Sequence, residues 1–218
     1  MSGSRSMCLI RNGLMSSIDR LYTEEIPALV IAPSGDISET LPESPLVLAG
    51  SFNPLHDGHR EMLAAASELT GKDGYLEISI QNVDKPLLPR PELGRRAAAI
   101  TSIGLSLIVT SAPRFTEKSS VLPGTSFVIG FDTFVRLLDE KYYPDHVAGE
   151  ASAVENSLNL IEENRCKFVV AGRKDDQEVF NELSLAEIPA RYRKMFTGLS
   201  ESQFRSDISS TELRDRSK

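Results

Sequence analysis

Two histidines and two glycines lie within one ten-residue stretch, Gly-Ser-Phe-Asn-Pro-Leu-His-Asp-Gly-His, at residues 50–59. His56 and His59 are three residues apart, so both imidazoles can face one point at the start of a helix, and Gly58 between them adds no side chain. Gly50 allows the backbone to approach an anion closely, and a helix start offers free N–H groups and the positive end of the helix dipole. The stretch therefore predicts a phosphate-binding turn. The alternative is a structural turn with two surface histidines.

A second motif lies near the C-terminus. Ser209 and Glu212 have the spacing of a capping box, which predicts that a helix starts there. The helix is too short to be stable alone and needs tertiary contacts. Its free N–H groups and the hydroxyls of Ser210 and Thr211 could bind a phosphate, and Arg214 could add a forked pair of donors. Capping alone would also explain this motif.

The elements that must position these motifs follow an α/β pattern, because from residue 46 short apolar runs alternate with helical stretches. Strands are predicted at residues 28–32, 46–49, 76–80, 105–110, 126–130 and 167–171, and helices at 58–69, 92–103, from about 132, and at 154–163. The first motif directly follows the strand at 46–49. It should therefore lie at the carboxyl edge of a parallel sheet, where ligands of such sheets bind.

The remaining segments carry weaker patterns. Residues 83–91 contain three prolines and are predicted to form a loop. Residues 175–185 could be helical, Pro189 interrupts that helix, and residues 192–196 should form a turn. We expect residues 1–45 to be an N-terminal segment of unknown function with a Pro-rich linker, and residues 46–218 to be the main domain.

Composition limits the classes of function. The net charge of −7 argues against a long nucleic-acid track but not against a mononucleotide, which needs only a few basic groups. No apolar run could span a bilayer. The two cysteines lie far apart and lack metal-ligand spacing, so a reducing compartment is expected. Cytoplasmic localisation is predicted; residues 1–14 are Ser-rich with two arginines and no acid, which leaves a nuclear or organellar alternative. A homo-oligomer stays open.

Taken together, GSFNPLHDGH at 50–59 and ISSTELR at 208–214 resemble the paired signatures of the nicotinamide and nicotinate mononucleotide adenylyltransferases, within the HxGH nucleotidyltransferase superfamily. The resemblance covers roughly residues 46–216. It implies a Rossmann-like parallel sheet with helices on both faces. It also implies transfer of AMP from ATP to nicotinamide or nicotinate mononucleotide with release of pyrophosphate, a step of NAD synthesis that Mg²⁺ assists.

The resemblance also implies roles for individual residues. The catalytic residues would be His56, His59, which stabilises charge at the α-phosphate, and Arg214. The ATP-binding residues would be Gly50, Ser51, Phe52, Gly58, Arg173, Ser210 and Thr211, and those that bind the acceptor would be Asn53, Lys85, Arg95, Gly130 and Asp132. No residue is assigned as a metal ligand. For Lys85 with Arg95 and Arg96 the alternative is a solvated basic face, for Asp132 a helix cap, and for Arg173 a surface position.

The chain departs from the family in one respect, because it has no tryptophan to stack on a pyridine ring. Phe115, Phe131 or Phe134 could take that place. Two alternatives follow for the function. One is the same chemistry on another acceptor, as in phosphopantetheine adenylyltransferases or cytidylyltransferases. The other is a catalytically weak nucleotide-binding regulatory protein.

Overall fold

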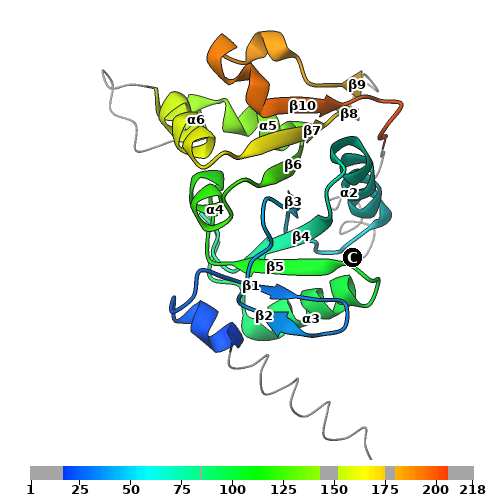
Figure 1. Cartoon of the computed structure of the whole chain (residues 1–218), viewed down its shortest axis with the longest axis vertical. Helices are drawn as coiled ribbons and strands as arrows, with labels where there is room; N and C mark the ends of the chain where they lie inside the picture. Colours follow the sequence, from blue (N-terminus) through cyan, green and yellow to red (C-terminus); the bar gives the residue numbers. More distant parts are fainter. Residues whose placement is uncertain (1–16, 84, 143–151, 175–179, 206–218) are drawn as a thin grey trace, which may run out of the picture.

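The computed structural model describes residues 17–83, 85–142, 152–174 and 180–205 (Figure 1). Its strands are β1 (Ala28–Ile31), β2 (Ile37–Ser38), β3 (Leu46–Ala49), β4 (Gly74–Ser79), β5 (Ser106–Thr110), β6 (Ser126–Gly130), β7 (Lys167–Ala171), β8 (Arg173–Lys174), β9 (Phe180–Asn181) and β10 (Phe196–Leu199). Residues 17–22 are helical, and the further α-helices are α2 (Asp57–Thr70), α3 (Arg90–Thr101), α4 (Phe115–Val121), α5 (Phe131–Leu137) and α6 (Ala153–Glu163). Short 3₁₀ helices lie at Glu140–Tyr142, Leu185–Glu187 and Ala190–Met195.

The described strands form an eight-stranded sheet in the order β10-β7-β6-β3-β4-β5-β1-β2, and β8 and β9 form a separate ribbon. The six strands from β10 to β5 run parallel. The chain adds β4 and then β5 on one side of β3, and afterwards β6, β7 and β10 on the other side. The order therefore reverses between β3 and β6, which is the topological switch point where doubly wound sheets bind ligands. The predicted α/β class is confirmed.

Two hydrophobic cores, one on each face of the sheet, hold the layers together. In β3, Leu46 and Leu48 belong to the core shared with α2 and α3, whereas Val47 belongs to the core shared with α5 and α6. Because both faces are covered, the strand is apolar at consecutive positions instead of alternating. This explains why LVLA at 46–49 was readable as a buried strand, and it confirms helices on both faces (Figure 1).

The described part of the N-terminal segment shares this sheet and core. β1 pairs antiparallel with β5, and β2, within the expected linker, pairs with β1. Ile18, Leu21 and Ile26 are buried in the same core as α2 and α3. The boundary expected after residue 45 therefore does not separate two hydrophobic cores.

Three segments differ from the sequence-based expectation. Neither α4 nor β10 was predicted, because seven and four residues respectively are too few for a clear periodic pattern. Residues 180–184 do not form part of the helix that was expected at 175–185. Phe180 instead pairs with Lys174 in the β8–β9 ribbon, and its ring lies so close to Gly172 that a Cβ atom there would be 2.5 Å from the ring. Residues 175–179 and the helix expected from Ser209 lie outside the described residues.

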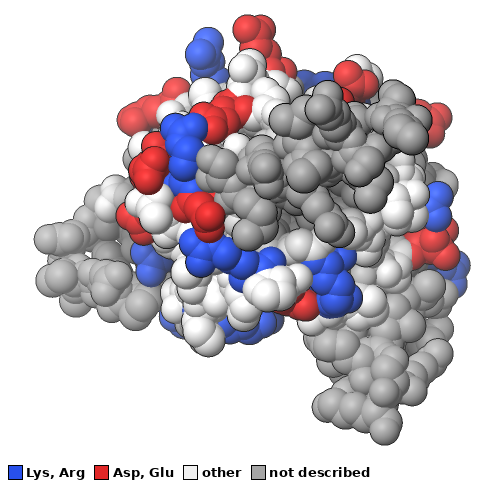
Figure 2. Space-filling model, turned by 90° about the horizontal axis from the view of Figure 1, so that it is seen from below, with Lys and Arg blue, Asp and Glu red and all other residues white. Residues whose placement is uncertain are grey.

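The helix predicted at 92–103 begins two residues earlier, at Arg90, because Pro91 is accommodated in its first turn. None of the described helices is both long and apolar enough to cross a membrane. On the face drawn in Figure 2, Lys and Arg side chains lie among Asp and Glu side chains.

Candidate active site

A cavity of about 660 Å³ opens at the carboxyl edge of β3 and β4, within the size range of small-molecule sites. Four of the residues assigned to ATP or acceptor binding from the sequence line it: Gly50, Ser51, Asn53 and Lys85. The other described residues of its wall include Glu77, Arg96, Phe115, Lys118, Thr133 and Arg136. The cavity therefore joins the loop after β3 to the ends of the neighbouring strands and to α3, α4 and α5.

The loop after β3 folds around a buried phenylalanine. Phe52 is only 4% exposed and has a left-handed backbone conformation with φ of 46°. A Cβ atom on Gly50 would lie 3.0 Å from the Phe52 ring, so any other residue would crowd the ring in this turn. The N–H of Gly50 donates to the carbonyl of Glu77 at 3.0 Å, so this N–H extends the sheet and is not a donor for a phosphate.

The two histidines lie side by side at the start of α2. Their ring centroids are 3.7 Å apart in a stacked arrangement, and the Phe52 ring meets His59 edge-on at 5.0 Å. His56 is the N-cap residue of α2, and its backbone N–H donates to Nδ1 of His59 at 3.3 Å. Since Nδ1 accepts this hydrogen bond, the ring proton of neutral His59 is on Nε2, which can act as a donor. Neither imidazole is among the residues that line the cavity.

Both histidines are neutral near pH 7. Burial, and to a smaller extent His56, lowers the pKa of His59 to about 4. Burial also lowers the pKa of His56, against the weaker attraction of Asp57. The pair can therefore enter a reaction as hydrogen-bond donors without positive charge, and a bound phosphate would raise both pKa values again.

Two arginines of α3 hold the loop from the other side. Arg96 Nη1 donates to the carbonyl of Ser51 at 2.8 Å, and Arg95 Nη2 donates to Asn53 Oδ1 at 3.0 Å. Both also bind Glu92, and these hydrogen bonds lower the pKa of that carboxyl to about 2. The Arg96 side chain is 11% exposed and lines the cavity, whereas that of Arg95 is 57% exposed and does not. Of the two, Arg96 is therefore the one that a molecule in the cavity could contact.

Gly130 and Asp132 lie where β6, the other strand of the switch point, passes directly into α5. Gly130 is the N-cap residue of α5, so the alternative that Asp132 caps this helix is wrong. Asp132 lies in the first turn and forms an ion pair with Arg173 of β8. A Cβ atom on Gly130 would meet nothing within 4 Å, so space is open above this helix start. The structure thus brings Asp132 and Arg173 together, although neither lines the cavity.

The sequence reasoning missed a buried ion pair in the cavity wall. Lys118 Nζ donates to Glu77 Oε1 at 2.6 Å, and Thr110 Oγ1 donates to the same oxygen at 2.6 Å. One signal was available, because Glu77 is an acid within the apolar strand LEISI. An acid at a buried strand position requires a partner. Its partner Lys118 could not be found from the sequence, since α4 was not predicted.

The three candidate aromatic residues lie in different environments. Phe134 is fully buried in the core and offers no face to a ligand. Phe131 is half-buried outside the cavity wall, whereas Phe115 is half-buried within it. Phe115 is therefore the candidate that an acceptor in the cavity could contact.

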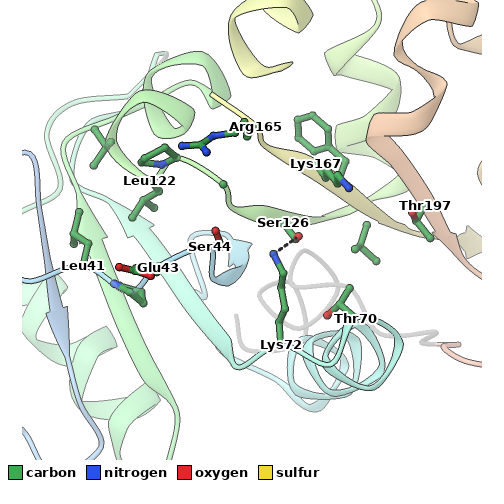
Figure 3. A pocket seen from close by; sticks show the side chains of 16 residues that line it. Leu41, Glu43, Ser44, Thr70, Lys72, Leu122, Ser126, Arg165, Lys167 and Thr197 are labelled. Atoms are coloured by element: carbon green, nitrogen blue, oxygen red, sulfur yellow. Dashed lines mark hydrogen bonds between the residues drawn. The ribbon is translucent and has the colours of Figure 1, made fainter. Parts of the chain in front are cut away.

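A second cavity, of about 910 Å³, lies at the opposite, amino edge of the sheet (Figure 3). Lys72 points across it and donates to Ser126 Oγ at 3.0 Å. Arg165, just before β7, and Lys167, the first residue of β7, also line it. None of the residues predicted from the sequence lies there.

Ser210, Thr211 and Arg214 lie outside the described residues. Among the residues that are described, no three His, Cys, Asp or Glu side chains are arranged to hold a metal ion.

Known proteins have sequences similar to that of this chain. It is 29% identical over 184 residues to the Gloeobacter violaceus protein "Probable nicotinate-nucleotide adenylyltransferase", and this match covers 78% of the chain and 82% of that protein. It is 29% identical over 111 residues to the Schizosaccharomyces pombe protein "Putative nicotinamide mononucleotide adenylyltransferase", covering 45% of the chain and 44% of that protein. The pattern of the cytidylyltransferase-like family matches residues 47–216. The doubly wound sheet and the paired histidines at its switch point agree with this match. Because the match covers most of the chain, the chain belongs to the cytidylyltransferase-like family of nucleotidyltransferases.

Proposed function

We propose that the protein transfers AMP from ATP to nicotinamide or nicotinate mononucleotide and releases pyrophosphate. The observation that carries the proposal is the stacked pair of His56 and His59 at the start of α2, beside a cavity at the switch point of the sheet. The names of the two similar proteins support this choice of acceptor.

The reaction needs no nucleophilic side chain. An oxygen of the acceptor's phosphate attacks the α-phosphorus of ATP, and the bond from that phosphorus to the pyrophosphate oxygen breaks in line. Catalysis then depends on positioning and on donors aimed at the charge that develops. In the proposed mechanism Nε2–H of His59 donates to an α-phosphate oxygen, because its other nitrogen is held by the backbone N–H of His56.

Cations take the remaining phosphate charge. Arg96 and Lys85 line the cavity and are available to phosphates. The proposal keeps Ser210, Thr211 and Arg214 as the group that binds the β- and γ-phosphates, on the basis of the capping-box motif.

In this proposal Mg²⁺ enters with ATP as the Mg–ATP substrate. The described carboxylates around the site are held in ion pairs: Glu77 with Lys118, Glu92 with Arg95 and Arg96, and Asp132 with Arg173. The described residues therefore fit a metal that the triphosphate itself carries better than a metal held by side chains.

Pyrophosphate release tests the proposal. The purified protein is incubated with Mg²⁺ and either ATP or CTP, against nicotinamide mononucleotide, nicotinate mononucleotide, phosphopantetheine and a phospho-alcohol. We expect turnover with ATP and at least one pyridine mononucleotide. Turnover only with CTP or with another acceptor would replace the proposed substrates. ATP binding without turnover of any pair would support a nucleotide-binding regulatory protein instead.

A further inference from the structure

The wall of the active-site cavity contains a nearly dry ion pair that the reaction proposed above does not use. Glu77 is 1% exposed and Lys118 5% exposed. Lys118 Nζ lies 2.6 Å from Glu77 Oε1 and 2.8 Å from the carbonyl oxygen of Ala112. Thr110 Oγ1 donates to Glu77 Oε1 at 2.6 Å and accepts from the N–H of Ala112 at 3.3 Å. The pair therefore fixes the ends of β4 and β5 to α4.

Stability alone does not account for this pair. Removing two charges from water costs several kcal/mol per ion, and replacing a buried pair by apolar residues of similar size is often neutral or stabilising. A pair of this kind is a candidate for a specificity device, and Glu77 and Lys118 both line the cavity that contains Gly50, Ser51 and Asn53. A molecule held at the loop after β3 would lie in the same cavity as the pair.

The charges around the cavity are not evenly distributed. Besides Lys118, the described lining residues include three cations, Lys85, Arg96 and Arg136, and Glu77 is their only carboxylate. Because Glu77 balances Lys118, this part of the wall is polar without net charge, whereas the loop side next to Arg96 is cationic. The cationic side suits phosphates, and the balanced side suits a neutral polar group.

The pair also has hydrogen-bonding capacity left. Lys118 has three N–H donors, of which the described residues use two, and Oε2 of Glu77 accepts no hydrogen bond from any residue that is described. A carboxamide matches the remaining N–H donor of Lys118 and the acceptor Oε2 of Glu77, since its oxygen accepts from Lys118 and its NH₂ group donates to Glu77. A carboxylate would place its charge beside that of Glu77. Phe115, in the same wall, offers the edge or face of a ring to a planar group.

We propose that Glu77 and Lys118 determine the acceptor by binding a neutral carboxamide on its ring and disfavouring a carboxylate. This rests on the proposed function and selects nicotinamide mononucleotide over nicotinate mononucleotide. Glu77 and Lys118 are specificity-determining residues in this proposal, and His59 remains the group that acts on the α-phosphate.

The test compares kcat/KM for the two mononucleotides at saturating Mg–ATP. We expect the wild type to prefer nicotinamide mononucleotide. Glu77→Gln leaves the charge of Lys118 unbalanced. It should therefore lower the ratio of kcat/KM for nicotinamide mononucleotide to kcat/KM for nicotinate mononucleotide at least about tenfold, the size expected when a polar site loses a matched group. The KM for ATP should stay unchanged. Lys72→Met, a lysine substitution at the opposite edge, is the matched control and should leave the ratio unaltered.

A second variant covers the chance that Glu77→Gln does not fold. Glu77→Gln with Lys118→Met removes both charges together and should fold, as neutral replacements of buried pairs generally do. Its ratio should approach 1, both in turnover and in calorimetric binding of each mononucleotide without ATP.

The outcomes separate this inference from the proposed function. Equal use of both mononucleotides by the wild type, or an unchanged preference in either folded variant, would overturn the inference and leave the proposed function standing. If the wild type turns over neither mononucleotide, the proposed function itself fails and the inference falls with it.

Discussion

The two edges of the parallel sheet both have a cavity with several cations, yet their surroundings differ. At the carboxyl edge, the cavity lies on the side of the sheet where α2, α3 and α5 start, and helix starts offer free N–H groups and positive dipole ends. At the amino edge, the larger cavity lies where α2 and α6 end (Figure 3). Helix ends of opposite sign therefore face the two cavities.

This difference changes what the cations mean. Lys72 follows directly after Gly71, the C-cap residue of α2, and Arg165 follows directly after Asn164, the C-cap residue of α6. Cations near helix C-termini offset the negative dipole ends. Lys72 and Arg165 thus have a structural role that does not require a ligand, whereas Arg96 adds positive charge to an edge that is already positive. Cavity size alone would favour the amino edge, where none of the residues predicted from the sequence lies.

The largest effect on the difference between the two edges is expected from His59. His59→Ala removes the donor Nε2–H, and we expect kcat to fall by about 100- to 1000-fold, the usual effect of losing one donor to a developing charge. Pyrophosphate release at saturating ATP measures this, and thermal unfolding by circular dichroism checks the fold. A folded variant with wild-type turnover would remove His59 from the mechanism and with it the main functional distinction of the carboxyl edge.

The elements that carry this site were largely predictable from the sequence. The strands at 46–49, 126–130 and 167–171 have their predicted bounds, because each is a continuous apolar run buried on both faces. α2 lies within one residue of its expected range of 58–69. Short elements were missed, since the stability of α4 and β10 comes from tertiary packing and not from a periodic pattern.

The site itself was predictable only where its residues are neighbours in the chain. The loop from Gly50 to His59 is one contiguous motif, so its turn, its helix start and its two imidazoles could be expected together. The pair Glu77 and Lys118 joins residues 41 positions apart, and that contact depends on how α4 packs onto β4. Arg95 and Arg96 are adjacent, and only the helix rotation decides which of them lines the cavity.

Low pH should lower the stability of the protein through His59, at the carboxyl edge. The pKa of His59 is about 4 in the folded protein, against 6.5 for the unfolded chain. Between these values the unfolded chain binds a proton that the folded protein does not, so stability falls as pH falls from 6.5 to about 4, by about 2 kcal/mol after allowing for partial solvent exposure. Urea unfolding at pH 7.5 and pH 5 measures the loss.

His59→Gln is the control for that pH dependence, because other groups titrate in the same range. The loss of stability between the two pH values should be smaller in the variant than in the wild type. An equal loss in both would mean that His59 is not the group responsible. Binding of ATP should reduce the acid effect, since the phosphates favour the protonated imidazole.

Two glycine substitutions distinguish the contribution of the loop after β3 from that of the neighbouring helix α3. Gly50→Ala places a Cβ atom 3.0 Å from the Phe52 ring, so we expect a loss of about 1–2 kcal/mol in stability and roughly tenfold in kcat as the loop shifts. Gly94→Ala in α3 meets nothing within 4 Å and should instead stabilise by about 0.5–1 kcal/mol with normal turnover. Similar kcat values for both variants would contradict the conclusion that the turn depends on the close packing of Phe52 against Gly50.

The smallest effect is expected at the amino edge, from Lys72→Met. The side chain keeps its length but loses its charge, and therefore its attraction to the end of α2 and its hydrogen bond to Ser126. Burial and the neighbouring Lys167 already lower the pKa of Lys72, so the lost attraction is partly offset by relief of that repulsion. We expect a stability change of about 0.5 kcal/mol or less and kcat/KM within about twofold of wild type. Urea unfolding and pyrophosphate release measure the two quantities. A tenfold change in kcat/KM would show that α2, which has Lys72 near one end and the histidines at the other, couples the two edges, and the functional contrast between them would no longer hold.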